Sequence, residues 1–202
     1  WSKLDVFYVF ATDGDSDFAT LNWKTPASFQ ATKVNSPTFT LNQGFQGDGT
    51  SAYIDTNWNP STQGINYTQN DASFGIYRNN NIDTTTRVMG LGYLSSLREQ
   101  NTTIQPINSS SAAASNSLKG NGIGLRILNR TTANDVAMIV DDTLETATSS
   151  SDAIINNNMG ILYRGDGTNF SLSEVSLALA GANLVTQRTD LYNAINTYLT
   201  SI

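Results

Sequence analysis

The sequence contains no cysteine and no histidine among its 202 residues. Without cysteine the chain cannot form disulfides, thiolate metal sites, cysteine nucleophiles or iron–sulfur clusters. Without histidine it lacks the commonest general base of enzymes and the commonest protein ligand of transition metals. A serine–histidine–aspartate triad is excluded for the same reason. These two absences remove most of the chemistry by which such a chain could act as an enzyme, so we do not expect catalysis.

Charged residues are also scarce, at 14% of the chain, and 11 basic against 17 acidic residues give a formal net charge of −6. The basic residues are not clustered enough to follow a phosphate backbone, which argues against nucleic acid as a partner. No apolar run approaches the ~18 residues that a membrane span needs, so membrane insertion is not expected. The length fits one domain over residues 1–202, which we expect to be the C-terminal part of a longer protein.

What the sequence has instead is a succession of short runs with alternating apolar and polar residues, each bounded by glycine, asparagine, aspartate or proline. Their spacing is typical of a β-sandwich. The first run is apolar on both faces and predicts a strand covered on both sides. The glycine-rich run 44–54 has no Walker lysine and predicts a tight turn. The ten predicted strands are 4–10, 29–34, 38–41, 52–56, 72–78, 87–93, 123–128, 136–140, 160–163 and 170–179.

One segment, from residue 186 to the C-terminus, has the periodicity of a helix. Its apolar residues recur at steps of three and four: Leu191, Ile195, Tyr198, Leu199 and Ile202. Thr186 stands where a helix N-cap is expected. The pattern therefore predicts an all-β body of two sheets covered by a short C-terminal helix.

Three carboxylates alternate in the loop after the first predicted strand: Asp13, Asp15 and Asp17. This spacing is used by calcium-binding loops, whose ions take six to eight oxygen ligands. The EF-hand pattern fails, because Phe18 replaces the required glycine and Lys24 replaces the bidentate glutamate. Two hypotheses remain, a different Ca²⁺ site completed by backbone carbonyls or Asp48, and a polar turn in which aspartates cap backbone amides. We favour the polar turn.

Aromatic residues in predicted loops are candidates for carbohydrate binding, because a sugar ring stacks on an aromatic plane while amides bond its hydroxyls. Trp58, Asn59 and Tyr67 combine two aromatic rings with amide groups. Tyr93 and Tyr163 are further candidates. The alternative for each ring is burial against the rim of a sheet, whereas a binding role requires an exposed Trp58 and Tyr67.

Carboxylate pairs for glycoside hydrolysis are missing, because the three glutamates are scattered singly along the chain: Glu99, Glu145 and Glu174. A hydrolase built on aspartates alone stays open, since Asp141 and Asp142, or the 13–17 loop, could approach another carboxylate in the fold.

Several motifs together resemble concanavalin A-like (laminin G-type) domains of bacteriophage virion and tail proteins. The motifs are LDVFYVF at 4–10, DGDSDF at 13–18, NWK at 22–24, NSPTFT at 35–40, GFQGDGTSAY at 44–53 and LYNAINTYL at 191–199. The resemblance implies an all-β, two-sheet antiparallel jelly-roll sandwich with a short C-terminal helix. It also implies a location on the virion surface, outside the cell.

For function, the resemblance implies a non-enzymatic domain of a tail fibre, spike or head fibre that binds host-surface carbohydrate. The second hypothesis is a capsid or tail decoration domain that contacts only other virion structural proteins, including further copies of itself. The third is a polysaccharide-degrading enzyme. The histidine of legume-type metal sites is missing here, so a calcium site does not follow from the resemblance.

Overall fold

The computed structural model describes residues 1–80, 85–98, 107–110 and 122–202. Within them, strands of one sheet are β1 (Leu4–Val9), β3 (Thr38–Thr40), β4 (Gly44–Gln46), β6 (Ala72–Arg78), β9 (Gly124–Arg130), β10 (Asp135–Val140), β11 (Thr143–Thr148) and β13 (Glu174–Gly181). Strands of the other are β2 (Thr32–Val34), β5 (Tyr53–Asp55), β7 (Arg87–Gly92), β8 (Ser95–Arg98) and β12 (Gly160–Ile161). The helical segments are η1 (Phe18–Thr20), α1 (Pro60–Gln63), η2 (Val185–Gln187) and α2 (Arg188–Leu199).

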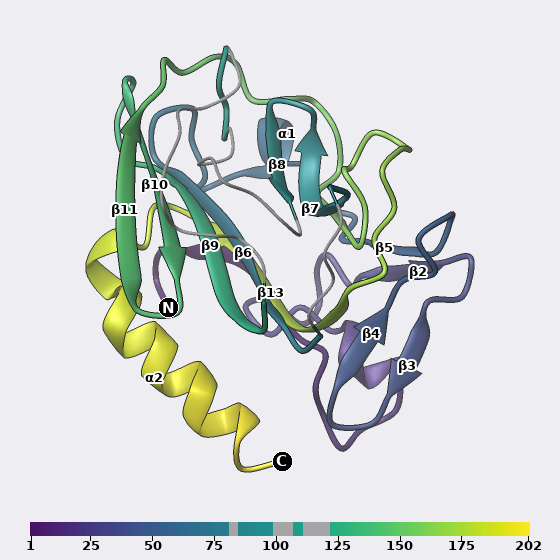
Figure 1. The fold of residues 1–202 in the computed structure, drawn as a ribbon. Coiled ribbons are helices and arrows are strands. Elements are labelled where there is room, and N and C mark those ends of the chain that lie inside the picture. Colours follow the sequence, from purple (N-terminus) through teal and green to yellow (C-terminus); the bar gives the residue numbers. More distant parts are fainter. Residues whose placement is uncertain (81–84, 99–106, 111–121) are drawn as a thin grey trace.

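The strands form two antiparallel sheets (Figure 1). The eight-stranded sheet has the order β11-β10-β9-β6-β13-β4-β3, and β1 pairs with the part of β13 that β4 leaves open. The five-stranded sheet has the order β2-β5-β12-β7-β8. The predicted all-β, two-sheet antiparallel jelly-roll sandwich with a C-terminal helix is therefore confirmed.

The main core lies between the two sheets, because period-two alternation turns one face of each strand inward. Phe74 and Leu128, which face each other across β6 and β9, are fully buried there. Ile54 and Met89 contribute from the five-stranded sheet. The core therefore draws on strands that are far apart in the sequence.

A second apolar layer lies between the eight-stranded sheet and α2, which runs along the outer face of that sheet (Figure 1). Val9, Ile127 and Leu179 of the sheet pack here with Ile195 of the helix. Strand β1 has Tyr8 in the main core and Val9 in this layer, which explains why the first run is apolar on both faces. The prediction of a strand covered on both sides is confirmed.

The helix predicted from residue 186 begins at Arg188 in the structure. Residues 185–187 form a 3₁₀ turn in which the Gln187 amide donates to the Leu184 carbonyl at 3.0 Å, and α2 begins at Arg188. Thr186 is therefore inside that turn and is not the N-cap, and Gln187 at the cap position makes no side-chain cap. In the part of the chain that the structure describes, no helix is long and apolar enough to cross a membrane.

Candidate functional site

Trp58 and Tyr67, two of the four predicted sugar-binding residues, are buried. Their exposed fractions are 0% and 2%, and the rings meet edge to face with centroids 5.8 Å apart. The Tyr67 hydroxyl donates to Asn108 Oδ1 at 2.9 Å, and the Trp58 carbonyl accepts from the Met159 amide at 2.9 Å. These bonds draw the 56–67 loop inward, so the expectation that the two rings are exposed is wrong. Both belong to the core.

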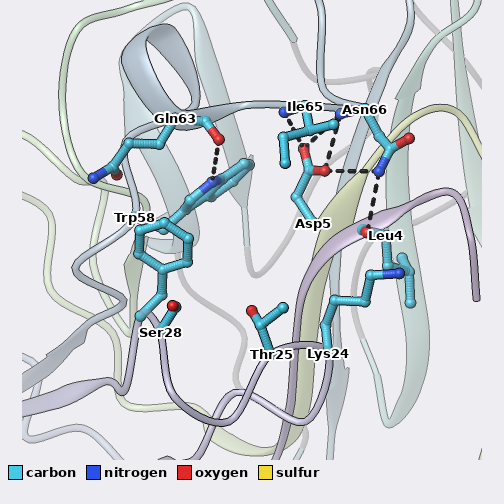
Figure 2. Close-up of a pocket in the computed structure, with 10 residues that line it drawn as sticks. Leu4, Asp5, Lys24, Thr25, Ser28, Trp58, Gln63, Ile65 and Asn66 are labelled. Atoms are coloured by element: carbon cyan, nitrogen blue, oxygen red, sulfur yellow. Dashed lines mark hydrogen bonds between the residues drawn. The ribbon is translucent and has the colours of Figure 1, made fainter.

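Trp58 nevertheless borders a cavity of about 380 Å³ that Leu4, Asp5, Lys24 and Asn66 also line (Figure 2). The polar groups drawn there bond mainly to one another. The indole N–H donates to the Gln63 carbonyl at 3.4 Å, and the Asp5 carboxylate accepts from the backbone and side chain of Asn66 at 2.9 and 2.8 Å. Because these groups are already used to hold the loop, we assign this cavity to the architecture of the fold.

Asn59, the third predicted residue, caps helix α1. The Asn59 Oδ1 accepts from the Ser61 backbone amide at 3.0 Å, while the backbone amide of Asn59 donates to Gln63 Oε1 at 2.7 Å. This reciprocal arrangement resembles a capping box, with Gln63 one position further along the helix than in the usual motif, and Pro60 at the first helical position supports it. The Asn59 Nδ2 donates to Asn156 Oδ1 at 2.7 Å. Both the oxygen and the nitrogen of the Asn59 side-chain amide are therefore hydrogen-bonded within the fold.

Tyr93, the fourth predicted residue, is 52% exposed in the turn between β7 and β8. The guanidinium carbon of Arg87 lies 5.8 Å from its ring centroid and that of Arg164 lies 5.7 Å away, both within cation–π range. Of the three aromatic residues among the four predicted, Tyr93 is the exposed one. Tyr163 is 5% exposed and packs against Tyr53 with ring centroids 4.1 Å apart.

The two arginines beside Tyr93 are held by specific bonds. Arg87 donates through Nε to Ser96 Oγ at 2.9 Å and through Nη1 to the Thr85 carbonyl at 3.0 Å. Arg164 pairs with Asp166, whose Oδ2 lies 2.8 Å from both Nε and Nη2 and whose Oδ1 lies 3.0 Å from Nε. These contacts fix both guanidiniums, which is the condition for a preorganised site.

A third arginine completes the cluster, because the β7–β8 register places Arg98 opposite Arg87. The pKa of Arg87 is lowered to about 10, first by burial and then by the positive charges of Arg98 and Arg164. Sequence analysis missed this cluster. A hairpin interpretation of residues 87–98 would have paired Arg87 with Arg98, but nothing local connects Arg164 to them.

Tyr93 also lines a cavity of about 210 Å³, together with Asn108 and Asp152. A buried network holds its floor. Arg130, from β9, donates through Nε to the Ile107 carbonyl at 3.1 Å, and Asn108 Nδ2 donates to the Thr68 carbonyl at 3.3 Å. Arg130 of the eight-stranded sheet therefore helps to hold the loop residues that line this cavity.

The aspartate loop forms a capped turn. Asp15 Oδ1 accepts from the amides of Asp17 and Phe18 at 3.0 and 2.8 Å, and Asp17 Oδ1 lies 2.6 Å from Lys33 Nζ. Among the described residues, no three acidic, histidine or cysteine side chains gather to hold a metal ion. The capping interpretation is confirmed. Calcium binding by Asp13, Asp15 and Asp17 stays a prediction, without support from this geometry.

The comparisons give the fold a wider setting. No protein-family model and no curated protein matches the chain. A Trypanosoma rangeli sialidase in complex with 2-keto-3-deoxy-D-glycero-D-galacto-2,3-difluoro-nononic acid matches with a TM-score of 0.53 and 13% identity, over 95% of this chain and 32% of that chain. Another structure of the T. rangeli sialidase has a TM-score of 0.50, 13% identity, and coverage of 95% and 33%.

Domain 4 of AbnA, a GH43 extracellular arabinanase from Geobacillus stearothermophilus solved with arabinotriose, has a TM-score of 0.46 and 13% identity, over 94% of this chain and 98% of that chain. The chain spans about a third of the length of the sialidases. At these identities the similarity to the sialidases concerns the sandwich fold and not the activity.

Proposed function

We propose that this chain is a non-enzymatic carbohydrate-binding β-sandwich domain, with Tyr93 as the residue on which a sugar ring stacks. The observation that carries the proposal is the half-exposed Tyr93 ring at the edge of a cavity of about 210 Å³, with two guanidiniums near it. An aromatic plane beside a cavity with polar groups is the arrangement that sugars recognise.

The fold supports this proposal only in a general way. The T. rangeli sialidase that shares the sandwich fold was solved with a sugar derivative bound, although this chain corresponds to a third of it. A setting on the virion surface, outside the cell, with a host-surface glycan as the partner, rests on the sequence resemblance alone. We keep it as part of the proposal.

The carboxylates considered for hydrolysis support a non-enzymatic role. Asp141 Oδ1 accepts from the Leu125 amide at 3.0 Å, and Asp142 Oδ1 accepts from the Thr189 hydroxyl at 2.7 Å. Both side chains therefore hold elements of the fold together. Incubation with host polysaccharides, followed by an assay for new reducing ends, tests this part, and their release would contradict it.

An apolar groove favours a second candidate function, an assembly domain that contacts other structural proteins. The groove has a volume of about 340 Å³ and lies between β1 and α2, with Trp1, Trp23 and Tyr198 among its lining residues. Trp1 is 67% exposed and Trp23 is 41% exposed. Exposed apolar patches of this kind mark contact sites between proteins.

The experiment that separates the two functions compares Tyr93→Ala with Trp23→Ala on a glycan array and in sedimentation velocity. We expect Tyr93→Ala to weaken glycan binding by about tenfold or more, equivalent to about 1.4 kcal/mol, with an unchanged melting temperature. Trp23→Ala is the matched control and should retain glycan binding. Retention by both variants, with self-association lost only in Trp23→Ala, would favour the assembly function.

A further inference from the structure

The apolar groove between β1 and α2 is a cavity built on rigid elements of the fold. It has a volume of about 340 Å³, and the ten residues that line it are all apolar or aromatic. Most of them belong to β1, β13 and α2, and the N-terminal segment lies beside α2 there (Figure 1). Because strands and helices hold a site more precisely than loops do, the groove is a preformed cavity.

The groove is open because α2 has a small residue at its centre. Leu191, Ala194 and Tyr198 line it, at helical steps of three and four. Leu191 and Tyr198 pack against the sheet, while Ala194 between them is exposed. The methyl group of Ala194 therefore leaves a space between two large side chains, and a bulky residue at this position would fill it.

The lining offers a ligand apolar contact and few hydrogen bonds. The hydroxyl of Tyr198 already donates to the Ala11 carbonyl at 2.9 Å. Trp1 and Phe7 meet edge to face, with ring centroids 5.7 Å apart. The volume is close to the lower limit of about 300 Å³ for small-molecule pockets, so the groove takes one short hydrocarbon chain and not the two chains of a phospholipid.

Positive charge lies beside the groove in a chain whose formal net charge is −6. The Lys24 Nζ is 5.5 Å from the centroid of the Trp1 ring and donates to the Trp1 carbonyl at 3.1 Å. In the part of the chain that the structure describes, the ion pairs involve other cations, and Lys24 has no carboxylate partner. An ammonium has three donors, so Lys24 has two left for an anionic group next to Trp1.

We propose that this groove binds a free fatty carboxylate of medium chain length. Its hydrocarbon chain lies between Trp1, Trp23 and Ala194, and its carboxylate pairs with Lys24. The site is on the outer face of the eight-stranded sheet, whereas Tyr93 is in a turn of the other sheet, so the proposal is independent of carbohydrate binding. A second copy of the chain is the competing occupant, and the charge of Lys24 favours the carboxylate.

Calorimetric titration of the whole chain with sodium decanoate, below its micelle concentration, tests the proposal. We expect octanoate to bind about tenfold more weakly, because two fewer methylene groups are buried. Decyltrimethylammonium has the same chain with the opposite charge and should also bind about tenfold more weakly. Absence of decanoate binding, or equal binding of the two decyl probes, overturns the proposal.

Lys24→Gln tests the pairing of the head group. It should weaken decanoate binding about threefold or more, as expected for an exposed ion pair, and should not weaken binding of decyltrimethylammonium. Lys24→Arg keeps the charge and is the matched control, which should bind decanoate like the parent chain. Unchanged decanoate affinity in Lys24→Gln overturns the assignment of a carboxylate ligand.

Ala194→Trp tests the location, because its ring should fill the groove and abolish decanoate binding. Asn193→Trp, at an exposed neighbour outside the groove, is the matched control and should bind decanoate normally. Trp23→Ala removes a lining ring and gives the same test if Ala194→Trp fails to fold. Decanoate binding retained in the variants of residues 194 and 23 overturns the site. Self-association that Ala194→Trp abolishes in sedimentation velocity, without decanoate binding by the parent chain, assigns the groove to a second copy instead. Glycan binding should be unchanged in all these variants, so the proposed function stands or falls separately.

Discussion

The rings of Trp58 and Tyr67 meet edge to face in the core, with centroids 5.8 Å apart and planes inclined at 80°. The contact joins the loop that precedes α1 to the loop that follows it. Tyr67 extends the connection through its hydroxyl to Asn108, whose Nδ2 donates to the Thr68 carbonyl. Two aromatic residues that resemble a sugar platform in the sequence therefore close one end of the sandwich.

Trp58→Ala should lower the free energy of unfolding by about 3–5 kcal/mol, because a fully buried aromatic ring is replaced by a cavity. Denaturant unfolding at 25 °C measures the change. Tyr93→Ala is the control, and removal of its exposed ring should change stability by about 0.5 kcal/mol at most. A stable Trp58→Ala variant that has lost glycan binding would show that Trp58 belongs to the site instead.

Tyr67→Phe should cost about 1–3 kcal/mol, because it leaves the buried Oδ1 of Asn108 without its donor. The measurement is again denaturant unfolding, with the exposed Tyr93→Phe as the matched control that should behave like the parent chain. If the two variants were equally stable, the bond between Tyr67 and Asn108 would contribute nothing.

Asp48 should make the stability of the fold depend on acid pH. Backbone amides of Ser51, Ala52 and Thr50 donate to its carboxylate and hold its pKa well below the usual value. Because the folded pKa is lowered, this stabilisation is fully present above the unfolded pKa of about 3.9 and is lost as the pH falls toward the folded pKa.

Asp48→Asn therefore should be less stable than the parent chain at pH 7, and the difference should shrink as the pH falls from 5 to 2. Urea unfolding at several pH values measures it. Asp152→Asn serves as the control, since its Oδ1 accepts one backbone amide, that of Ala153. A difference that does not change with pH would mean that the turn does not depend on the charge of Asp48.

Millimolar calcium should leave the melting temperature unchanged, because the loop is already ordered by Asp15 bonds to backbone amides and by the Asp17–Lys33 ion pair. Differential scanning fluorimetry with calcium and with a chelator measures this. Calcium-dependent stabilisation that disappears in Asp15→Ala would instead establish the predicted metal site at Asp13, Asp15 and Asp17.

Some strands could be predicted from the sequence and others could not. The run 72–78 matches β6 from end to end, because its apolar residues Ala72, Phe74 and Ile76 stand at every second position, the period of a strand. Strand β4 lies in the run 44–54, which predicts a turn because it is rich in glycine and has no alternation. In the structure Gly44 takes a φ of +117° at the start of the strand. The predicted strand 29–34 shrinks to 32–34, since Phe29 adopts a φ of +58° that interrupts extended backbone.

The candidate site, too, could be predicted only in part from the sequence. Tyr93 could be found as an aromatic residue in a turn, and the structure leaves its ring exposed. Whether Trp58 faces solvent or the core could not be decided, since it depends on bonds to Met159, about a hundred residues away in sequence. The arginine cluster was missed because Arg164 reaches Tyr93 only through the fold.

The sequence by itself determined the fold class and most of the negative conclusions. Alternating apolar runs and one helical period are local properties, and missing cysteine and histidine exclude chemistry whatever the fold. Only the tertiary structure decided which aromatic ring is open and which arginines surround it. Exposure and electrostatic potential arise from contacts between residues that are far apart in the sequence, as between Arg164 and the ring of Tyr93, and no local pattern records them.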